Sequence, residues 1–203
     1  MGAGRVPALP AGRPPHGHLR SGSPSFPPLP YNHPVQYVRP AGSNPSFLLK
    51  ALSEASGELR QCFYGIRRSI LLRPAEGQDE PWTLLGLACH MRDVELGVNE
   101  QLQTILARRG DPPIPHVGID DIPFREDYED EDEDEVIEEF HYYRRQTAYQ
   151  LWDISEREWE RAGVHPYRGR MTVLDLARDL YQHDLEHLWQ ARRMVEAVAS
   201  ASR

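Results

Sequence analysis

The sequence predicts an all-α protein: a four-helix bundle that follows a disordered, proline-rich N-terminal tail. Two observations lead to this fold class. Four long segments repeat apolar residues at helical spacing, and no segment shows the alternation of a convincing strand. Four amphipathic helices bury their apolar stripes by packing together as an antiparallel bundle. Because 203 residues suit one such domain plus a tail, we assign residues 1–45 to the tail and 46–203 to the bundle.

The tail is defined by its composition. Residues 1–45 contain no Asp or Glu, and their prolines, such as those in Pro27–Pro30, exclude a long helix or a central strand. We find no apolar stretch that suits a secretory signal or a membrane span, and the prolines also exclude the amphipathic helix of a transit peptide. The two cysteines, Cys62 and Cys89, form no disulfide framework. We therefore expect a cytoplasmic protein without a membrane partner.

The negative charge is concentrated in one segment. The net charge is −8, and residues 120–139 contain 13 acidic residues and one arginine. Within this segment the run Glu129–Glu135 is typical of a solvated loop, and the alternative is a binding site for a basic partner. No basic patch or nucleic-acid-binding motif accompanies this charge, so we do not expect a nucleic-acid partner.

The helix boundaries follow from caps and helix-breaking residues. Thr83 is a suitable N-cap for the second helix, and Thr172 with Asp175 has the layout of a capping box at the start of the fourth. The four helices are expected at residues 47–72, 84–109, 136–152 and 173–198. Between the second and third helices we expect an acidic crossover loop at about residues 111–135, because a connection of this length can run along the bundle.

Three histidines lie on inward-facing stripes. His183 and His187 are four residues apart, so they share one face of the fourth helix, and His90 occupies the buried stripe of the second. Burying an unpaired imidazole costs about 1 to 3 kcal/mol, and a shared divalent metal ion removes this cost. Three nitrogen ligands leave at least one position for water or substrate, as in catalytic sites. We predict a site for Zn, Ni or Fe on these histidines, without assigning catalytic residues.

Two other interpretations of these histidines remain open. Each could be a core residue that bonds to neighbouring carboxylates or carbonyls. The string His183–His187 also partly matches the HExxH motif of zinc proteases, but Asp184 stands where that motif has Glu, and a bundle offers no strand edge for a peptide. Asp93 and Asp184 are expected either to accept protons from the far ring nitrogens of the ligands or to be solvated.

Two strings give the chain a family resemblance. The first is His90–Glu95, which follows Trp82 and an apolar run, and the second is Gly169–Thr172 leading into His183–Gln190, a HDxxHxxQ pattern. Over about residues 46–200 the chain resembles the DinB-like family of bundle proteins. The acidic run and the tail do not belong to the common pattern of that family.

The resemblance implies an up-down-down-up four-helix bundle, frequent homodimers and a metal triad at His90, His183 and His187. Characterised relatives are metal-dependent S-transferases that join a low-molecular-weight thiol to an electrophile, or related hydrolases and isomerases. We therefore expect a metal-dependent enzyme with a thiol and an electrophile as partners, and with Tyr142 or Tyr143 bordering its pocket. The alternative is a non-enzymatic metal-binding or stress-associated protein whose acidic loop recruits a partner.

Overall fold

The computed structural model describes residues 44–74, 82–117 and 126–201. All of these belong to one compact unit, Val35–Arg203. Its four long helices are α2 (Pro45–Phe63), α4 (Leu84–Ala107), α5 (Glu133–Asp153) and α6 (Val173–Ala201). Almost all of the predicted tail lies outside the described residues. Among the described helices, none is both long enough and apolar enough to cross a membrane.

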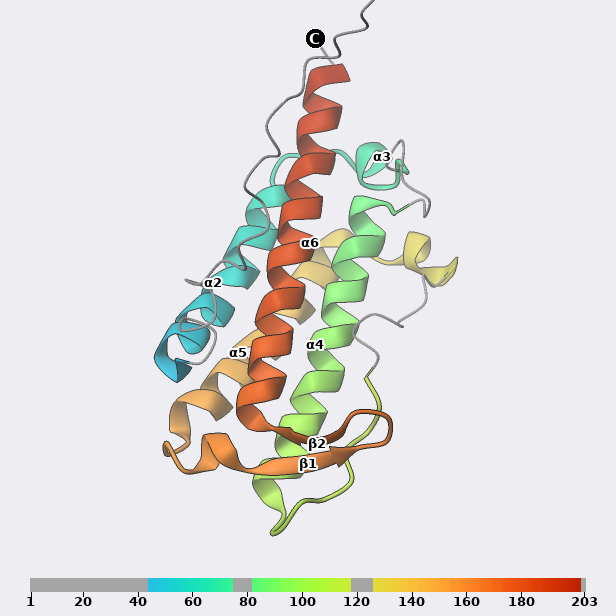
Figure 1. The fold of residues 1–203 in the computed structure, drawn as a ribbon. Coiled ribbons are helices and arrows are strands. Elements are labelled where there is room, and N and C mark those ends of the chain that lie inside the picture. Colours follow the sequence, from blue (N-terminus) through green and yellow to red (C-terminus); the bar gives the residue numbers. More distant parts are fainter. Residues whose placement is uncertain (1–43, 75–81, 118–125, 202–203) are drawn as a thin grey trace, which may run out of the picture. The chain divides into compact units, whose positions relative to one another are not determined.

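The helices have the predicted up-down-down-up directions. In Figure 1, α2 and α6 run one way along the bundle, and α4 and α5 run the other way. Both α2 and α4 pack against α5 and against α6. The consecutive helices α4 and α5 are thus parallel neighbours, so the chain must return along the bundle between them. The last part of this return contains the short 3-10 helix η1 (Glu126–Asp130), and residues 118–125 of the predicted crossover lie outside the described part.

The first helix is shorter than predicted. It begins at Pro45, where the Asn44 side chain accepts hydrogen bonds from two backbone N–H groups. It ends at Phe63 rather than near residue 72. Gly65 has a φ of 74°, in the left-handed region that glycine adopts at little cost, and the chain turns there into the short helix α3 (Arg68–Leu71). The apolar spacing continues across this turn, which explains the prediction of one longer helix.

The caps of the second and fourth helices are confirmed. Thr83 Oγ1 accepts a hydrogen bond from the Gly86 N–H at 2.9 Å. At the start of α6, the Asp175 N–H donates to Thr172 Oγ1 at 3.0 Å, and the Thr172 N–H donates to Asp175 Oδ2 at 3.0 Å. Aspartate therefore completes the capping box in place of glutamate.

A small hairpin that the sequence did not predict precedes α6. Strands β1 (Ala162–His165) and β2 (Gly169–Thr172) pair antiparallel, after the 3-10 helix η2 (Glu158–Glu160). Val164 also exchanges backbone hydrogen bonds with the segment that follows α4, donating to the Pro112 carbonyl at 2.8 Å. The hairpin thus anchors the end of α4 to the start of α6. Strands of four residues are too short for an alternating pattern to identify.

The acidic run is mostly helical and not a loop, contrary to the prediction, whereas five of its seven side chains are exposed, in line with the predicted solvation. Asp132 caps α5 by accepting from the backbone N–H groups of Asp134 and Glu135, so the helix begins at Glu133 instead of near Val136. Acidic residues in a first helical turn are stabilised by the helix dipole. Glu131 also binds Arg92 at 3.0 Å, and Glu133 pairs with an arginine of α3. The run therefore contacts the bundle through Glu131 and Glu133, while its remaining side chains are exposed.

The core consists of two apolar clusters separated by a polar layer. On each long helix, the residues of one cluster precede those of the other, so the clusters are stacked along the bundle. Between them lies Arg144 of α5, whose side chain is 1% exposed. Its guanidinium donates to Glu95 of α4 at 2.8 Å, to Asp184 of α6 at 2.5 and 2.9 Å, and to the Leu52 carbonyl of α2 at 3.0 Å. One side chain thus bonds to all three other helices.

Replacing Arg144 tests this arrangement. We expect Arg144→Met to lower the free energy of unfolding by about 3 to 5 kcal/mol, because it leaves the carboxylates of Glu95 and Asp184 buried without their cation. Urea denaturation at neutral pH measures the change. The control is Arg145→Met, which removes the same charge from the next, exposed position and should change stability by about 0.5 kcal/mol or less. Equal losses in the two variants would contradict the role given to Arg144.

Candidate metal centre

The structure brings the three predicted histidines together. His90 lies two turns into α4, and His183 and His187 lie in the middle of α6, which packs against α4. His90 Nε2 is 2.9 Å from His183 Nε2 and 3.2 Å from His187 Nε2. One potential ligand atom from each residue lies within 4.8 Å of the other two. The helical spacing that suggested the site therefore produces convergent nitrogen atoms.

Burial keeps two of these histidines neutral. His90 and His183 are buried, while His187 is half-buried, so the cluster is most accessible from the His187 side. Burial, together with the neighbouring His187, lowers the pKa of His90 to about 4 and that of His183 to about 2. Both imidazoles are therefore neutral at neutral pH, and each has one nitrogen lone pair that can bind a metal ion.

The proton inventory of the cluster favours a cation. A neutral imidazole has one N–H and one lone pair, so its Nε2 either donates one hydrogen bond or accepts one. His90 Nε2 faces two other Nε2 atoms at hydrogen-bond distance, and no placement of protons on three neutral rings satisfies both contacts. A metal ion satisfies all three lone pairs at once. The residues therefore fit a divalent ion that accepts imidazole ligands, such as Zn, Ni or Fe.

Gln190 orients one of the three rings. His187 Nδ1 is 3.0 Å from Gln190 Oε1, and because an amide oxygen only accepts, the proton of His187 lies on Nδ1. Its Nε2 lone pair then points into the cluster, as in metal sites where a neighbouring group fixes the ring. The sequence contained Gln190 within its HDxxHxxQ string, but spacing alone did not assign this role.

The two aspartates expected beside the ligands have other partners. Asp184 is bound by Arg144, since it lies about 100° around the helix from His183 and points toward α5. Asp93 accepts hydrogen bonds from Tyr128 Oη at 2.7 Å and from Arg92. The Nδ1 atoms of His90 and His183 are buried, and among the described residues they have no hydrogen-bond partner. Within the described residues, His187 is therefore the one histidine of the three whose Nδ1 has a hydrogen-bond partner, which is Gln190.

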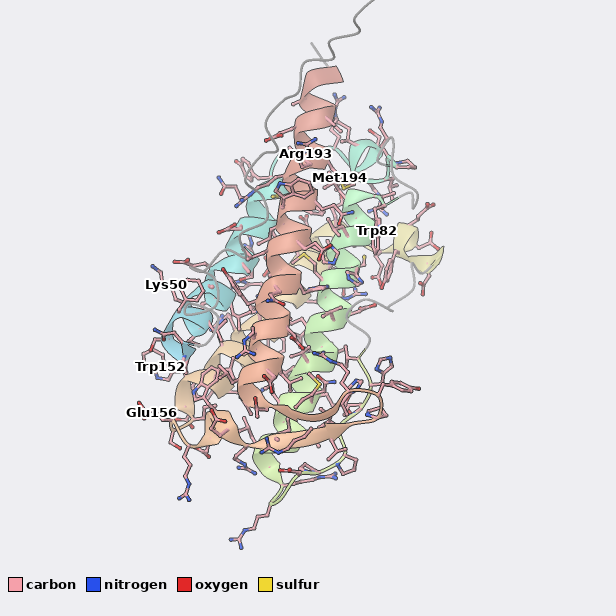
Figure 2. All side chains as sticks on the ribbon, in the orientation of Figure 1. Lys50, Trp82, Trp152, Glu156, Arg193 and Met194 are labelled. Carbon is pink, nitrogen blue, oxygen red and sulfur yellow. The ribbon has the colours of Figure 1, made fainter. Side chains whose placement is uncertain are left out.

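Aromatic and apolar groups border the cluster. The Trp82 ring lies 5.3 Å from the His90 ring and 6.2 Å from the His187 ring, and Figure 2 shows Trp82 beside the upper half of α4.

Cys89 is fully buried, and burial raises the pKa of its thiol to about 12, so it packs in the core as a neutral group. Tyr142, one of the two tyrosines considered for the pocket, instead lines a cleft between α2 and α5.

Comparison with known proteins identifies the family. The chain is similar to YfiT from Bacillus subtilis, described as a probable metal-dependent hydrolase with an unusual four-helix bundle topology. The two share 15% sequence identity over 76% of this chain and 87% of that chain, with a TM-score of 0.68, so the likeness establishes the fold. No curated protein matches the chain. A family model described as the DinB superfamily matches residues 23–191, and the chain therefore belongs to the DinB superfamily.

Proposed function

We propose that this protein is a metal-dependent enzyme that holds one divalent ion on His90, His183 and His187. The observation that carries the proposal is the convergence of three imidazole Nε2 atoms, two of them on buried neutral rings, that cannot satisfy one another by hydrogen bonds. The likeness to a probable metal-dependent hydrolase supports metal dependence. When bound, the ion would supply Lewis acidity and a position for water or a thiol.

The finer proposal concerns the reaction. We place the substrate on the His187 side, because that histidine is half-buried whereas the other two are enclosed. There the Trp82 ring offers a flat apolar wall, and Gln190 keeps the His187 ring in one orientation. This arrangement suits transfer of a low-molecular-weight thiol to an electrophile, or a related hydrolysis, in which the metal activates the nucleophile.

The binding-protein alternative is the weaker of the two. It required the whole acidic run to remain available to a basic partner, but two of its seven acids, Glu131 and Glu133, bind arginines of the same chain. Glu139 and Glu138, which follow the run, also pair with Arg92 and Arg60. The homodimer and the cytoplasmic location that the sequence suggested remain predictions.

Metal analysis tests the site itself. We expect about one equivalent of a divalent metal in the purified parent protein and almost none in a His183→Ala, His187→Ala double variant, since two of three ligands are lost. The control is His141→Ala, which removes a half-buried histidine of α5 that bonds to Ser56. Elemental analysis of all three, before and after reconstitution, gives the answer. A parent that stays metal-free after reconstitution would overturn the proposal.

Activity is a separate expectation. Metal-loaded parent protein should conjugate a low-molecular-weight thiol to a broad electrophile such as a bimane or chloro-dinitrobenzene, or hydrolyse a related substrate. The double variant should lose this turnover, while His141→Ala should keep it. Product formation followed by absorbance or chromatography measures the rate. A loaded parent with no turnover across several thiols and hydrolytic substrates would leave the metal site standing and remove the enzymatic function.

Gln190 provides a finer test of the geometry. We expect Gln190→Leu to weaken metal affinity about 10- to 100-fold, because the His187 ring loses the acceptor that fixes its proton on Nδ1. Competition with a chromogenic chelator measures the affinity. Gln182→Leu is the matched control, since Gln182 is an exposed residue of the same helix, and it should leave affinity unchanged. If both variants bind the metal as tightly as the parent, Gln190 does not orient the ligand.

A further inference from the structure

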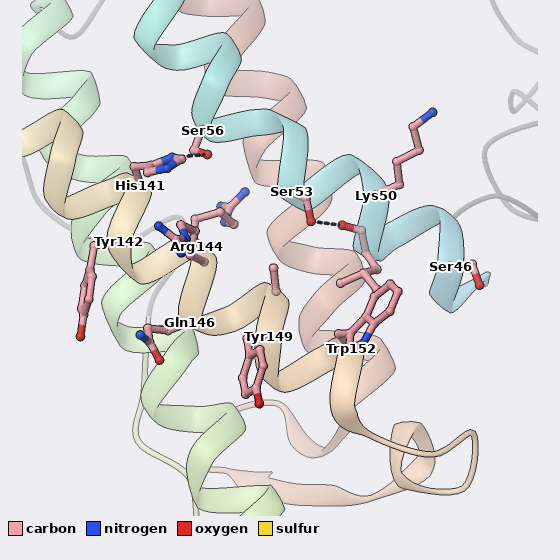
Figure 3. A pocket seen from close by; sticks show the side chains of 13 residues that line it. Ser46, Lys50, Ser53, Ser56, His141, Tyr142, Arg144, Gln146, Tyr149 and Trp152 are labelled. Carbon is pink, nitrogen blue, oxygen red and sulfur yellow. Dashed lines mark hydrogen bonds between the residues drawn. The ribbon is translucent and has the colours of Figure 1, made fainter.

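A second candidate site lies on helices that carry none of the three histidines. A cleft of about 960 Å³ runs between α2 and α5, whereas the histidines belong to α4 and α6 (Figure 3). This volume lies within the range of about 300 to 1,000 Å³ that is usual for small-molecule sites. The cleft contains none of the three histidines, so ligand binding there can be tested separately from the proposed metal chemistry.

Large aromatic side chains line the α5 side of the cleft. Tyr142, Tyr149 and Trp152 are 58%, 69% and 75% exposed. Their spacing of seven and three residues places them on one face of the helix, and Figure 3 shows them projecting from α5. Among the described residues, no hydrogen-bond acceptor is found for the Trp152 indole or the Tyr149 hydroxyl. Such amphipathic rings commonly contact ligands, with an apolar face and a polar edge both available.

The charged residues that line the cleft are all basic. They are Lys50 of α2 and Arg144 and Arg145 of α5, and no acidic residue contributes to the lining. Arg144 is buried at the bottom of the cleft, and its charge is neutralised by the carboxylates of Glu95 and Asp184. Lys50 makes only a long, exposed contact of 3.9 Å with Glu54, which contributes little. Arg145 is exposed, and within the described part of the chain it forms no ion pair.

The cleft therefore carries two available positive charges on a protein whose net charge is −8. It also contains hydroxyl groups, including Ser56, which bonds to His141 Nδ1 at 3.0 Å. A cleft that combines cations, hydroxyls and flat rings, and contains no carboxylate, is complementary to a ligand with an acidic group and an aromatic ring. A nucleic acid would need a larger basic surface, and the negative net charge would repel it.

We propose that the cleft between α2 and α5 binds a small organic anion that carries an aromatic ring system. The ring stacks on Tyr149 and Trp152, and the carboxylate or phosphate group is held by Lys50 and Arg145. The volume of the cleft favours a small molecule over a folded partner, and the positive charges of Lys50 and Arg145 favour an anion.

Calorimetric titration of the full-length protein tests the proposal with four probes. 1-Naphthyl phosphate and 2-naphthoate contain the ring and an acidic group, 2-naphthol lacks the charge, and inorganic phosphate lacks the ring. We expect both aromatic anions to bind, the tighter one showing which acid group is preferred, and the other two to bind at least about tenfold more weakly. Equal binding of 2-naphthol, or no binding of either aromatic anion, would overturn the proposal.

Variants locate the binding. Trp152→Ala and the double variant Lys50→Gln, Arg145→Gln should each weaken the aromatic anions about tenfold or more. The matched control is Arg193→Gln, because Arg193 lies over an exposed tryptophan outside the cleft, Trp189 of α6, at 5.5 Å. That control should bind normally. If it loses affinity while Trp152→Ala does not, the ligand occupies a different surface.

Two further measurements separate this proposal from others. Metal content should be the same in the parent and in all cleft variants. A failure of the cleft proposal therefore leaves the proposed metal-dependent function unaffected, and a failure of the metal proposal leaves the cleft unaffected. Sedimentation of the parent and of Trp152→Ala should give one molecular mass. A parent dimer that Trp152→Ala dissociates would show that a second copy covers the cleft, and the small-molecule proposal would be wrong.

Discussion

The fold depends on the guanidinium of Arg144, which bonds to every other long helix of the bundle. Its planar fork matches Asp184 with two parallel hydrogen bonds and still reaches Glu95 and the Leu52 carbonyl, a set that lysine cannot reproduce. Burial alone would lower the pKa of Arg144, but the attraction of Asp184 and Glu95 raises it above its usual value. Burial likewise raises the pKa of Asp184 to about 6, against the opposing pull of Arg144. Removing any one of Arg144, Glu95 and Asp184 would thus leave a buried charge without its partner, which lowers the stability of the fold.

The same polar layer positions the three histidines of the candidate metal centre. Asp184 follows His183 directly, so the bond from Arg144 to Asp184 fixes the rotation of α6 about its axis and with it the direction of the His183 ring. About two turns after His183, Gln190 fixes the ring of His187. His90 arrives from α4, the helix that Glu95 ties to the same arginine. Three rings converge because the layer beside them allows one arrangement of α4 and α6.

Local patterns predicted the parts of this structure that local physics determines. The helical repeats gave four helices, Thr83 and Thr172 marked two starts, and the i, i+4 spacing of His183 and His187 placed both rings on one face. The partners of Arg144 were not predictable, because they lie 40, 49 and 92 residues away along the chain. The prediction of a loop at the acidic run was wrong for a related reason. Its own composition indicates repulsion, whereas the arginines that stabilise it come from α3 and α4.

The parallel arrangement of α4 and α5 has a kinetic consequence. In a helical hairpin, the first contacts form across a short turn, and each one brings the next pair together. Here Arg92 contacts Glu139, Glu95 contacts Arg144 and Asn99 contacts Thr147, so every such pair is separated by 47 to 49 residues. The whole intervening loop must close before any of these contacts exists. The protein should therefore fold more slowly than an up-down-up-down bundle of the same length and stability. Contacts within each helix join residues close in sequence, but the contacts that pair α4 with α5 join distant ones.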